Sequence, residues 1–545
     1  MMMYVLQGVL ILVCLIEAAL QTVHYVHVLQ LHAYRPERYR KWMLADDKRT
    51  LPTARLILSG MPLAAMMMFG FEGTVGMIVT ACVCVLGILS AIADRPKSAK
   101  KPLVYTPRVR RLLATLTVIN GILLGVAFAA PPLFNMLRDS ILTDVETGAL
   151  TVSRSLPAML LLIVLMPVLF VQFANKLNAP IEKHIADGYT KDAKRILAGM
   201  PDLTVIGVTG SYGKTSVKNY LATLLSVKYS VLMTPESYNT PMGIVRTIRE
   251  HLRPEHEIFV CEMGSRNRGD IRELCEIVHP HHGVITAIGE QHLETFKTVD
   301  AVADTQFELV EALPENGIAF LNTDNEYIVS REVRGVKTVS YGLYDGAVYT
   351  ATDVVADENG SRFTVTAPDG DTCEYTTRLL GTHSIQNLLG CIAVANQLGI
   401  TLRELRSPVR HMKPVPHRLQ LLPDGFIDDT YNSNPAGFRA ALDVLGAMQD
   451  TRRVLITPCL LELGTRQDLI NKDLGIYAAS RCDWVVLIGE QAVQSFRNGL
   501  LSQGFDEEHI FVAMDLHQAL SFVRALPETE RQVVLLENDP PDKLL

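Results

Sequence analysis

The sequence predicts a membrane α-helical N-terminal region followed by two α/β domains. Three observations support this fold class. Apolar segments long enough to cross a bilayer are concentrated in the first third of the 545 residues. A strand, a glycine turn and a helix follow one another near residue 210, and strands alternate with helices from there onward. We therefore expect a transmembrane region at 1–175, a juxtamembrane linker at 176–200, and domains at 201–415 and 416–545.

Five apolar segments are candidate membrane spans. A bilayer core of ~30 Å requires about 20 helical residues, and four of the five segments come close to that length while the second is short. The first segment lacks the basic start and the cleavage site of a signal peptide, so we expect it to be retained. The five segments are Tyr4–Leu29, Ile57–Phe71, Thr74–Ala93, Leu112–Phe134 and Leu156–Ala174.

Basic residues predict the orientation of these spans. The loops after the first and third spans are rich in Lys and Arg, whereas the Glu72 turn has none and the segment 135–154 has two. By the positive-inside rule both basic loops are cytoplasmic, so the N-terminus lies outside and the chain emerges in the cytoplasm. The basic residues are Arg35, Arg38, Arg40, Lys41, Lys48, Arg49 and Arg55 in one loop, and Arg95, Lys97, Lys100, Lys101, Arg108, Arg110 and Arg111 in the other.

The linker that follows the last span is basic and amphipathic. Its cations could bind anionic lipid headgroups beside the inner leaflet, and a solvated helical linker explains them equally well. They are Lys176, Lys183, Lys191, Lys194 and Arg195.

Composition argues against two classes of function. The formal net charge of −7 is not that of a nucleic-acid-binding protein, which usually presents a basic face. The nine cysteines are scattered without a CxxC pair, so neither a disulfide framework nor a zinc site is expected.

A phosphate-binding loop is predicted at Thr209–Ser216. It follows the apolar run 203–208 and precedes a helical pattern at Val217–Leu225. In such a loop the helix N-terminus and backbone N–H groups face the phosphates, Lys214 reaches the β- and γ-phosphates, and the Thr215 hydroxyl ligates Mg²⁺. The upstream glycine, at 207, lies one residue too early for the full GxxxxGK[ST] pattern. We expect Gly210, Ser211, Tyr212, Gly213, Lys214, Thr215 and Ser216 to contact ATP.

Two further strands end in residues suited to the same site. The run 258–261 ends at Glu262, and the run 283–288 leads to His292. Ligands of open α/β sheets bind at the carboxyl ends of the strands, so we expect both side chains near the phosphate loop. A metal that bridges phosphates prefers hard oxygen ligands, which Glu262 would supply.

Seven motifs then occur in the order found in the Mur ligase family, over roughly 200–545. The stretch Asp428–Pro435, Asp-Asp-Thr-Tyr-Asn-Ser-Asn-Pro, most resembles the MurF branch, which adds D-Ala-D-Ala to a UDP-linked tripeptide. The other six are Thr209–Ser216, Glu262-Met263-Gly264, Ile288-Gly289 leading to His292-Leu293-Glu294, Leu321-Asn322-Thr323-Asp324, Gly381-Thr382-His383-Ser384-Ile385-Gln386-Asn387 and His417-Arg418.

The resemblance implies roles for individual residues. Lys214 and Thr215 would bind the phosphates and Mg²⁺, and Glu262 and His292 would be further metal contacts. Asn322 and Asn387 would contact the nucleotide, Asn387 in the motif that holds adenine. Arg418, on the C-terminal domain, would reach the ATP phosphates, and Asp429 would help that domain close over the site. Lys214, Glu262, His292 and Asp429 are therefore the expected catalytic residues.

The segment 338–378 and the C-terminal residues complete the predicted architecture. Short alternating runs at 349–355 and 362–366 indicate hairpin strands, an antiparallel appendage of the central domain. Strands near 454–456, 484–488 and 533–536 resemble the Rossmann-like C-terminal domain of the same ligases, which receives the amine substrate.

The chain departs from the family at three points. Membrane spans stand in place of the domain that holds the UDP-sugar. Gln306 stands where many Mur ligases carry a carbamylated lysine that holds a second metal, so that metal site should be weaker or differently made. Ser384 replaces an Asn, and Glu537-Asn538-Asp539-Pro540-Pro541 stands where MurF typically has a Lys-Gly-Ser-Arg type loop that helps bind substrate, which indicates a changed substrate.

These inferences lead to one expected function and two alternatives. We expect an ATP- and Mg²⁺-dependent amide ligase at the cytoplasmic face of a bacterial inner membrane. It would join a carboxylate of a cell-envelope precursor, soluble or lipid-linked, to an amine through an acyl phosphate. Expected partners are membrane lipids and envelope-synthesis proteins, not nucleic acid. The alternatives are a catalytically weak ATP-binding partner or regulatory subunit, and a membrane-bound polymer ligase resembling poly-γ-glutamate synthetases.

Overall fold

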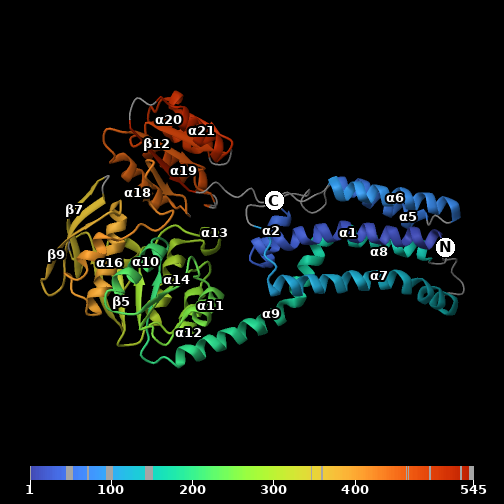
Figure 1. Ribbon diagram of the computed structural model, residues 1–545, viewed down its shortest axis with the longest axis horizontal. Coiled ribbons are helices and arrows are strands. Elements are labelled where there is room, and N and C mark those ends of the chain that lie inside the picture. Colours follow the sequence, from blue (N-terminus) through green and yellow to red (C-terminus); the bar gives the residue numbers. More distant parts are fainter. Residues whose placement is uncertain are drawn as a thin grey trace. The chain divides into compact units, whose positions relative to one another are not determined.

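The chain forms two compact units, residues 1–186 and 187–541, which are described separately (Figure 1). The structure is a computed structural model. It describes residues 2–44, 53–69, 73–93, 102–141, 151–344, 346–357, 360–431, 433–461, 463, 466–489, 493–527 and 531–538.

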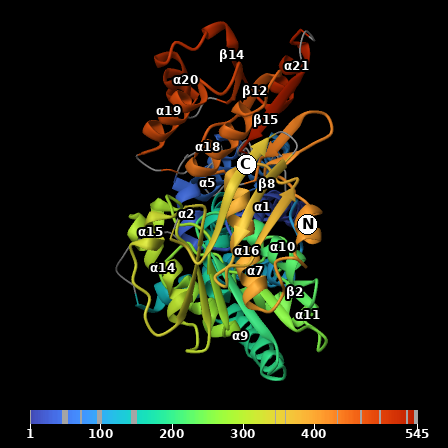
Figure 2. The ribbon, with the colours of Figure 1, turned by 90° about the vertical axis from the view of Figure 1, so that its left-hand side faces the viewer.

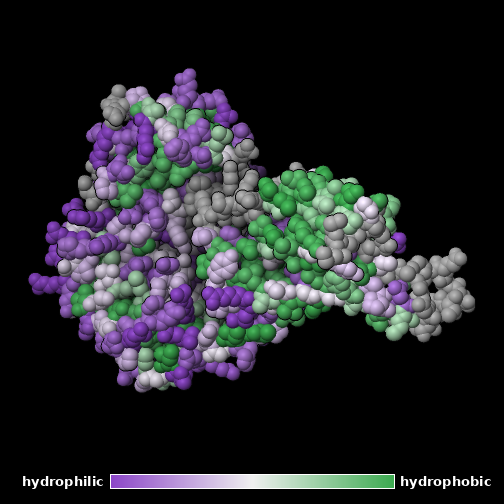
Figure 3. Space-filling view, turned by 45° about the vertical axis from the view of Figure 1, so that its right-hand side comes forward, coloured by the Kyte–Doolittle hydropathy of each residue, from purple (hydrophilic) through white to green (hydrophobic). Residues whose placement is uncertain are grey.

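The first unit is a bundle of helices with an apolar interior. Helix α1 packs along α6 and α8, while α8 also packs against α5 and α7. Large apolar side chains also cover much of the outer surface of this unit (Figure 3), as expected for helices that face lipid. The helices are α1 (Met2–Leu31), α2 (Pro36–Leu44), α4 (Thr53–Arg55), the π-helix η1 (Leu56–Gly60), α5 (Met61–Phe69), α6 (Gly73–Ala93), α7 (Pro107–Ile141), α8 (Val152–Leu165) and α9 (Pro167–Ala198).

The prediction of five spans needs correction. Within the described ranges, three helices are long and apolar enough to cross a membrane, and the number rises to four if a bent pair of helices counts as one span. The three segments are Tyr4–Leu31, Thr74–Ile92 and Pro107–Met136. The second predicted span is a shorter apolar helix, Leu56–Phe69, which begins with the π-helix η1 and continues as α5. Of the basic residues that predict the orientation, Lys48 and Arg49 of the first loop and Arg95, Lys97, Lys100 and Lys101 of the second lie outside the described residues.

The fifth predicted span is not one straight helix. Helix α8 ends at Leu165, and α9 begins at Pro167 with a bend of 77° between them. The backbone of Met166 is no longer helical, with φ −109° and ψ 19°. A proline has no N–H to donate and its ring clashes with the preceding turn, which ends a helix at this point. The apolar stretch 156–174 therefore changes direction in its middle.

The first predicted span contains a carboxylate, Glu17, that its average hydropathy does not reveal. Glu17 is 1% exposed and accepts hydrogen bonds from Ser59 Oγ (2.8 Å) and Ser90 Oγ (2.5 Å). The two serines lie on η1 and α6, so these bonds connect α1 to both. A buried carboxylate requires such donors.

The central domain of the second unit is built on a nine-stranded sheet. The strand order is β2-β3-β1-β4-β5-β6-β7-β8-β9, parallel as far as β7 and antiparallel beyond it. The strands are β1 (Thr204–Thr209), β2 (Val231–Met233), β3 (Ile258–Glu262), β4 (His282–Ile285), β5 (Ile318–Asn322), β6 (Lys337–Gly342), β7 (Tyr349–Asp357), β8 (Gly360–Thr366) and β9 (Thr372–Thr377).

Helices cover both faces of the parallel part of this sheet (Figure 2). The core on one face is formed with α10 and α16, and the core on the other with α11, α12 and α14. Strand β1 lies between β3 and β4. This is the position at which connections run to opposite sides, where α/β sheets bind ligands. The helices are α10 (Lys214–Leu225), α11 (Pro241–His251), α12 (Asp270–Val278), α13 (Leu293–Phe296), α14 (Val299–Glu311), α15 (Glu326–Val329), α16 (Thr382–Gln397) and α17 (Arg406–Arg410).

The predicted hairpins exist, but they are not an appendage. Strands β7, β8 and β9 pair antiparallel with one another, and β7 pairs parallel with β6. They therefore extend the same sheet that carries the phosphate loop. Their inward side chains, including Tyr349, Phe363 and Tyr375, belong to the core that also contains α10 and α16.

The C-terminal domain has its own six-stranded sheet, in the order β10-β11-β15-β12-β13-β14. All neighbours are parallel except β10 and β11. This confirms the predicted α/β character. The elements are β10 (Gln420–Leu421), β11 (Phe426–Asp429), α18 (Pro435–Gly446), β12 (Arg452–Thr457), α19 (Gln467–Ala478), β13 (Trp484–Ile488), α20 (Val493–Ser502), the 3-10 turn η3 (Glu507–His509), β14 (Ile510–Ala513), α21 (Leu516–Ala525) and β15 (Gln532–Glu537).

Candidate active site

Two glycines give the loop between β1 and α10 its shape. Gly210 has φ +142° and Gly213 has φ +79°, values that favour glycine. A Cβ on Gly210 would lie 2.2 Å from Thr286 Oγ1, and a Cβ on Gly213 would lie 2.6 Å from Asn387 Oδ1. Gly213 is also the N-cap of α10, so the helix begins directly after the turn. The backbone can thus approach a phosphate closely at a helix N-terminus.

The loop is held against the segment that follows β4. Ser211 N donates to Ala287 O (2.7 Å), and Ser211 Oγ lies 3.1 Å from the Gly289 N–H that donates to it. Tyr212 OH donates to Glu290 O (2.8 Å). These bonds orient the loop before a ligand binds. They also show that the Ser211 N–H has a protein partner.

Lys214 is the first residue of α10, directly after this loop. Its ammonium donates to Gly210 O (2.5 Å) and Ser211 O (3.3 Å). Burial lowers the pKa of Lys214 to about 8, although Glu262 acts in the opposite direction. A half-buried ammonium that contacts neutral carbonyls close to a carboxylate is well suited to an incoming polyanion.

Glu262 connects the loop to Asn239 and Lys218, two residues that the sequence did not single out. Its Oε1 accepts from Thr215 Oγ1 (3.3 Å) and from Asn239 Nδ2 (2.9 Å), while Oε2 lies 3.1 Å from Lys218 Nζ. Both Glu262 and Lys218 are 1% exposed. Lys218 is one helical turn after Lys214, and nothing in the motif distinguishes it from a surface lysine.

The residues at Glu262 fit a magnesium ion in part. Thr215 Oγ1 and Glu262 Oε1 are the hard oxygen donors such an ion requires. The described residues contain no group of three His, Cys, Asp or Glu side chains placed to hold a metal. His292 lies in the connection between β4 and α13, at φ +51°. Its role as a metal contact stays a prediction, and the remaining ligands would have to be phosphate oxygens and water.

Gln306 on α14 contacts the start of the phosphate loop. It is 2% exposed, and its Oε1 accepts from Thr209 Oγ1 (2.5 Å) and Gly210 N (3.1 Å). Its Nε2 donates to Ser265 Oγ (3.1 Å). The amide oxygen thus holds the start of the phosphate loop, and the amide nitrogen bonds the segment that follows β3. This arrangement explains how the chain is stable with an amide at this position.

A cavity of about 520 Å³ opens between the phosphate loop and the C-terminal domain. The central domain contributes Gly213, Ser216, Asn322 and Asn387, and the C-terminal domain contributes Arg418, Asp429, Tyr431, Ser433 and Arg439, among others. The predicted nucleotide contacts Ser216, Asn322, Asn387 and Arg418 thus face one cavity. Asn322 also bonds Thr286 O through Nδ2 (2.9 Å), which fixes its side chain at the wall.

His383 lines the cavity, and its protonation state was not predicted from the sequence. Burial lowers its pKa to about 4, with a further contribution from Arg418, so the imidazole is neutral at pH 7. Its buried Nδ1 has no hydrogen-bond partner among the residues that the structure describes.

Two carboxyl groups meet at the ends of β11 and β15. Asp429 and Glu537 are paired in register on these neighbouring parallel strands. Burial raises the pKa of Asp429 to about 6. Burial and the neighbouring Asp429 carboxylate raise the pKa of Glu537 well above its usual range. Ser433 Oγ donates to Glu537, and Arg418 lies close enough to favour the ionised forms. A lysine at position 537, as in the loop typical of the MurF branch, would remove one of the two carboxyl groups, so this acid pair would not form.

Comparisons with known proteins agree with this geometry. Residues 208–395 match the family described as Mur ligase middle domain, and residues 417–536 match the one described as Mur ligase, glutamate ligase domain. The helical residues that precede them lie outside both matches.

Similar proteins of known function share one name, UDP-N-acetylmuramoyl-tripeptide–D-alanyl-D-alanine ligase. The Escherichia coli protein is 32% identical over 296 residues, which are 53% of this chain and 65% of that protein. The Synechocystis protein is 32% identical over 321 residues, which are 57% and 68% of the two chains. The match therefore spans just under two thirds of the Escherichia coli relative.

Solved structures show the same likeness. MurF from Acinetobacter baumannii superposes with a TM-score of 0.60 at 26% identity, over 65% of this chain and 77% of that one. MurF from Thermotoga maritima in complex with ADP gives 0.58 at 26% identity, over 65% and 80%.

Proposed function

Because this chain belongs to the Mur ligase family, we propose that it is an ATP-dependent ligase that joins a carboxylate of a peptidoglycan precursor to an amine. One observation carries the proposal. Tyr212, Gly213 and Ser216 of the phosphate loop line one cavity together with Arg418 and Asp429 of the C-terminal domain, whereas Lys214, Thr215 and Glu262 are not among its lining residues. Phosphoryl transfer requires positioned charges at the phosphates more than a nucleophilic side chain, and Arg418 lies in the cavity wall while Lys214 directly follows Gly213.

The proposed reaction has two steps. The γ-phosphoryl group of ATP passes to a substrate carboxylate, which gives an acyl phosphate and ADP. The amine nitrogen then attacks the acyl carbon, the carbon–oxygen bond to phosphate breaks, and one amine proton is released. Lys214 and the N-terminus of α10 neutralise the transferring phosphate, and Arg418 approaches from the other domain. Magnesium, held by Thr215 and Glu262, would neutralise charge between the β- and γ-phosphates.

We propose that the helical unit places this reaction at the cytoplasmic face of a membrane. Three of its helices are long and apolar enough to cross a bilayer, and the basic residues predicted to follow the first and third spans favour a cytoplasmic location for both loops. In this chain these helices precede both ligase-domain matches. The carboxylate substrate is accordingly either a UDP-linked or a lipid-linked muropeptide.

A turnover assay tests the function and separates the two substrates. Purified protein in detergent would be given ATP, Mg²⁺ and D-alanyl-D-alanine with either a UDP-linked or a lipid-linked muropeptide. ADP release together with a matching product mass identifies the substrate. ATP hydrolysis without an amide product in either case would contradict ligase activity and favour the ATP-binding partner. A product mass that grows with repeated additions would favour the polymer ligase.

A further inference from the structure

Residues 167–184 of α9 lie across the ends of the helices that precede them. Val168, Val171 and Ala174 are buried in a core with Tyr25, Leu29, Leu112 and Leu116 of α1 and α7. Tyr39 OH donates to Val168 O (3.2 Å), and Asn175 Nδ2 donates to Tyr34 O (3.1 Å). After the 77° bend from α8, this part of α9 is therefore packed against the two candidate spans and not free.

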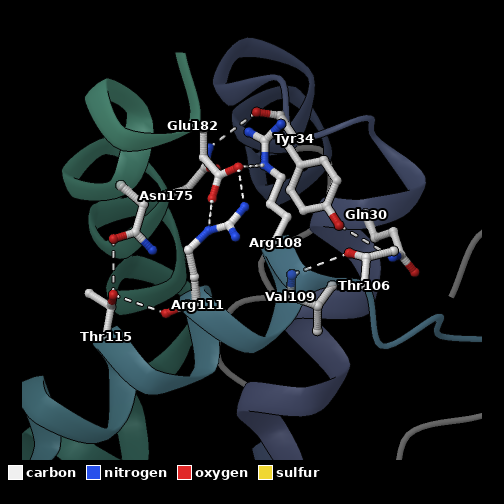
Figure 4. A network of polar contacts seen from close by, with 10 residues as sticks. Gln30, Tyr34, Thr106, Arg108, Val109, Arg111, Thr115, Asn175 and Glu182 are labelled. Carbon is white, nitrogen blue, oxygen red and sulfur yellow. Dashed lines mark hydrogen bonds and ion pairs between the residues drawn. The ribbon is translucent and has the colours of Figure 1, made fainter. Parts of the chain in front are cut away.

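A polar network fixes α9 to α7 and to the end of α1 (Figure 4). The Arg111 guanidinium donates to both oxygens of Glu182, at 2.7 and 2.8 Å. Arg108 also points toward Glu182 and stacks on the Tyr34 ring, 4.0 Å from its centroid. One turn along α7, Thr115 Oγ1 donates to Asn178 Oδ1 (2.9 Å). A bidentate pair between an arginine and a carboxylate has a defined geometry. The pair of Arg111 and Glu182 therefore fixes the rotation of α9 about its own axis.

The opposite face of α9 is apolar and exposed. Leu169, Phe173, Leu177 and Ile181 are 43%, 57%, 55% and 54% exposed. They recur every four residues, so they form one stripe along the helix. The packing and the network that bury the inner face keep this stripe turned outward. In water it would be an apolar patch with no partner.

Two lysines border this stripe. Lys176 and Lys183 are exposed and seven residues apart, so they share one flank of the helix. An apolar stripe next to a lysine flank is the composition of helices that lie in the bilayer interface. The 77° bend also gives α9 a direction unlike that of α8, which precedes it.

We propose that residues 167–184 form an interfacial helix whose Leu169–Ile181 stripe is buried among acyl chains and whose lysines bind anionic headgroups. The occupant of the exposed face is the lipid bilayer, because the helices against which α9 packs also expose large apolar side chains, such as Leu20 on α1 and Val118 on α7. This inference rests on the proposed membrane insertion of α1, α6 and α7.

Photocrosslinking of the full chain in nanodiscs tests the inference. The change Phe173→p-benzoylphenylalanine places a photoreactive ring in the stripe. Ile122→p-benzoylphenylalanine, at a 61% exposed position of α7, reports membrane insertion itself, and Met514→p-benzoylphenylalanine, 80% exposed on the C-terminal domain, reports background. We expect lipid adducts at 173 and 122 and none at 514. Adducts at 122 without adducts at 173 would overturn the interfacial helix alone. Absence at both would overturn membrane insertion as well.

A second arm tests the headgroup contact. The 173 adduct should form in several-fold higher yield in phosphatidylglycerol nanodiscs than in phosphatidylcholine nanodiscs. The double change Lys176→Gln and Lys183→Gln should abolish this difference and leave the adduct at 122 unchanged. Equal yields in the two lipids for the unaltered lysines would contradict anionic headgroup binding.

Discussion

At the scale of single residues, Lys214 has the clearest expected role. We expect Lys214→Ala to lower ATP-dependent turnover by about 100-fold or more, because it removes a preorganised charge at the transferring phosphate. The protein should remain folded and membrane-bound. Lys228→Ala is the matched control, since that ammonium is on the surface and bonds Gly399 O (2.9 Å). Wild-type turnover in Lys214→Ala would refute the site assignment.

The lowered pKa of Lys214 predicts a dependence on pH. Below a pH of about 8 the lysine of the ligand-free protein is charged, and above it the charge is lost. ATP binding to the free protein should therefore weaken as pH rises through 8. The unfolded lysine keeps its proton up to its ordinary pKa near 10.5, so this group adds stability as pH rises between 8 and 10.5. Nucleotide titrations at pH 7 and pH 9 would check the binding, and equal affinities would contradict it.

The amide of Gln306 predicts a second effect on the loop. Gln306→Ala would leave the Gly210 N–H without its acceptor, a loss of about 1–3 kcal/mol, while the Thr209 hydroxyl would still have Met263 O at 3.2 Å. We expect a clear loss of ATP affinity with the fold retained. Gln306→Glu keeps an acceptor but adds negative charge next to the phosphate loop, so it should change the Mg²⁺ concentration required for half-maximal activity. An unchanged Mg²⁺ dependence would show that position 306 does not influence the metal.

At the scale of elements, α9 depends on the Glu182 network for its position. Glu182→Gln removes the paired charges with Arg111, so residues 175–186 should exchange amide hydrogens faster than in the wild type. Glu311→Gln is the control, because its contact with Arg272 is exposed at both ends and such pairs contribute little. Amide exchange followed by mass spectrometry measures this. Unaltered protection of 175–186 would mean that apolar packing alone holds the helix.

The elements also show which sequence signals were sufficient. The strand, glycine turn and helix at 204–225 were predicted because each local pattern agrees with the next. The break at Met166 was missed because hydropathy averages over a window, although Pro167 carried the signal. Hairpins at 349–377 were recognised, but their pairing with β6 depends on tertiary contacts that no local pattern encodes.

At the scale of the whole molecule, the sequence indicated individual site residues but not which of them lie close together in space. Arg418, Asn387 and the phosphate loop are far apart in the chain, and their common cavity was predictable only through the family resemblance. Lys218, Asn239 and His383 were not singled out as site residues, because a buried lysine or neutral histidine has no distinctive spacing. The Asp429–Glu537 pair follows from strand register, which a sequence alone does not give.

The central claim is that the cavity activates a carboxylate by phosphorylation, and oxygen transfer tests it most directly. A muropeptide substrate with ¹⁸O in its reacting carboxylate would be incubated with ATP, Mg²⁺ and the amine, and the released phosphate examined by mass spectrometry. An acyl phosphate leaves one carboxylate oxygen on the phosphate, so we expect one ¹⁸O per phosphate released. Phosphate without ¹⁸O would mean that water attacks ATP, which would contradict ligation in this site.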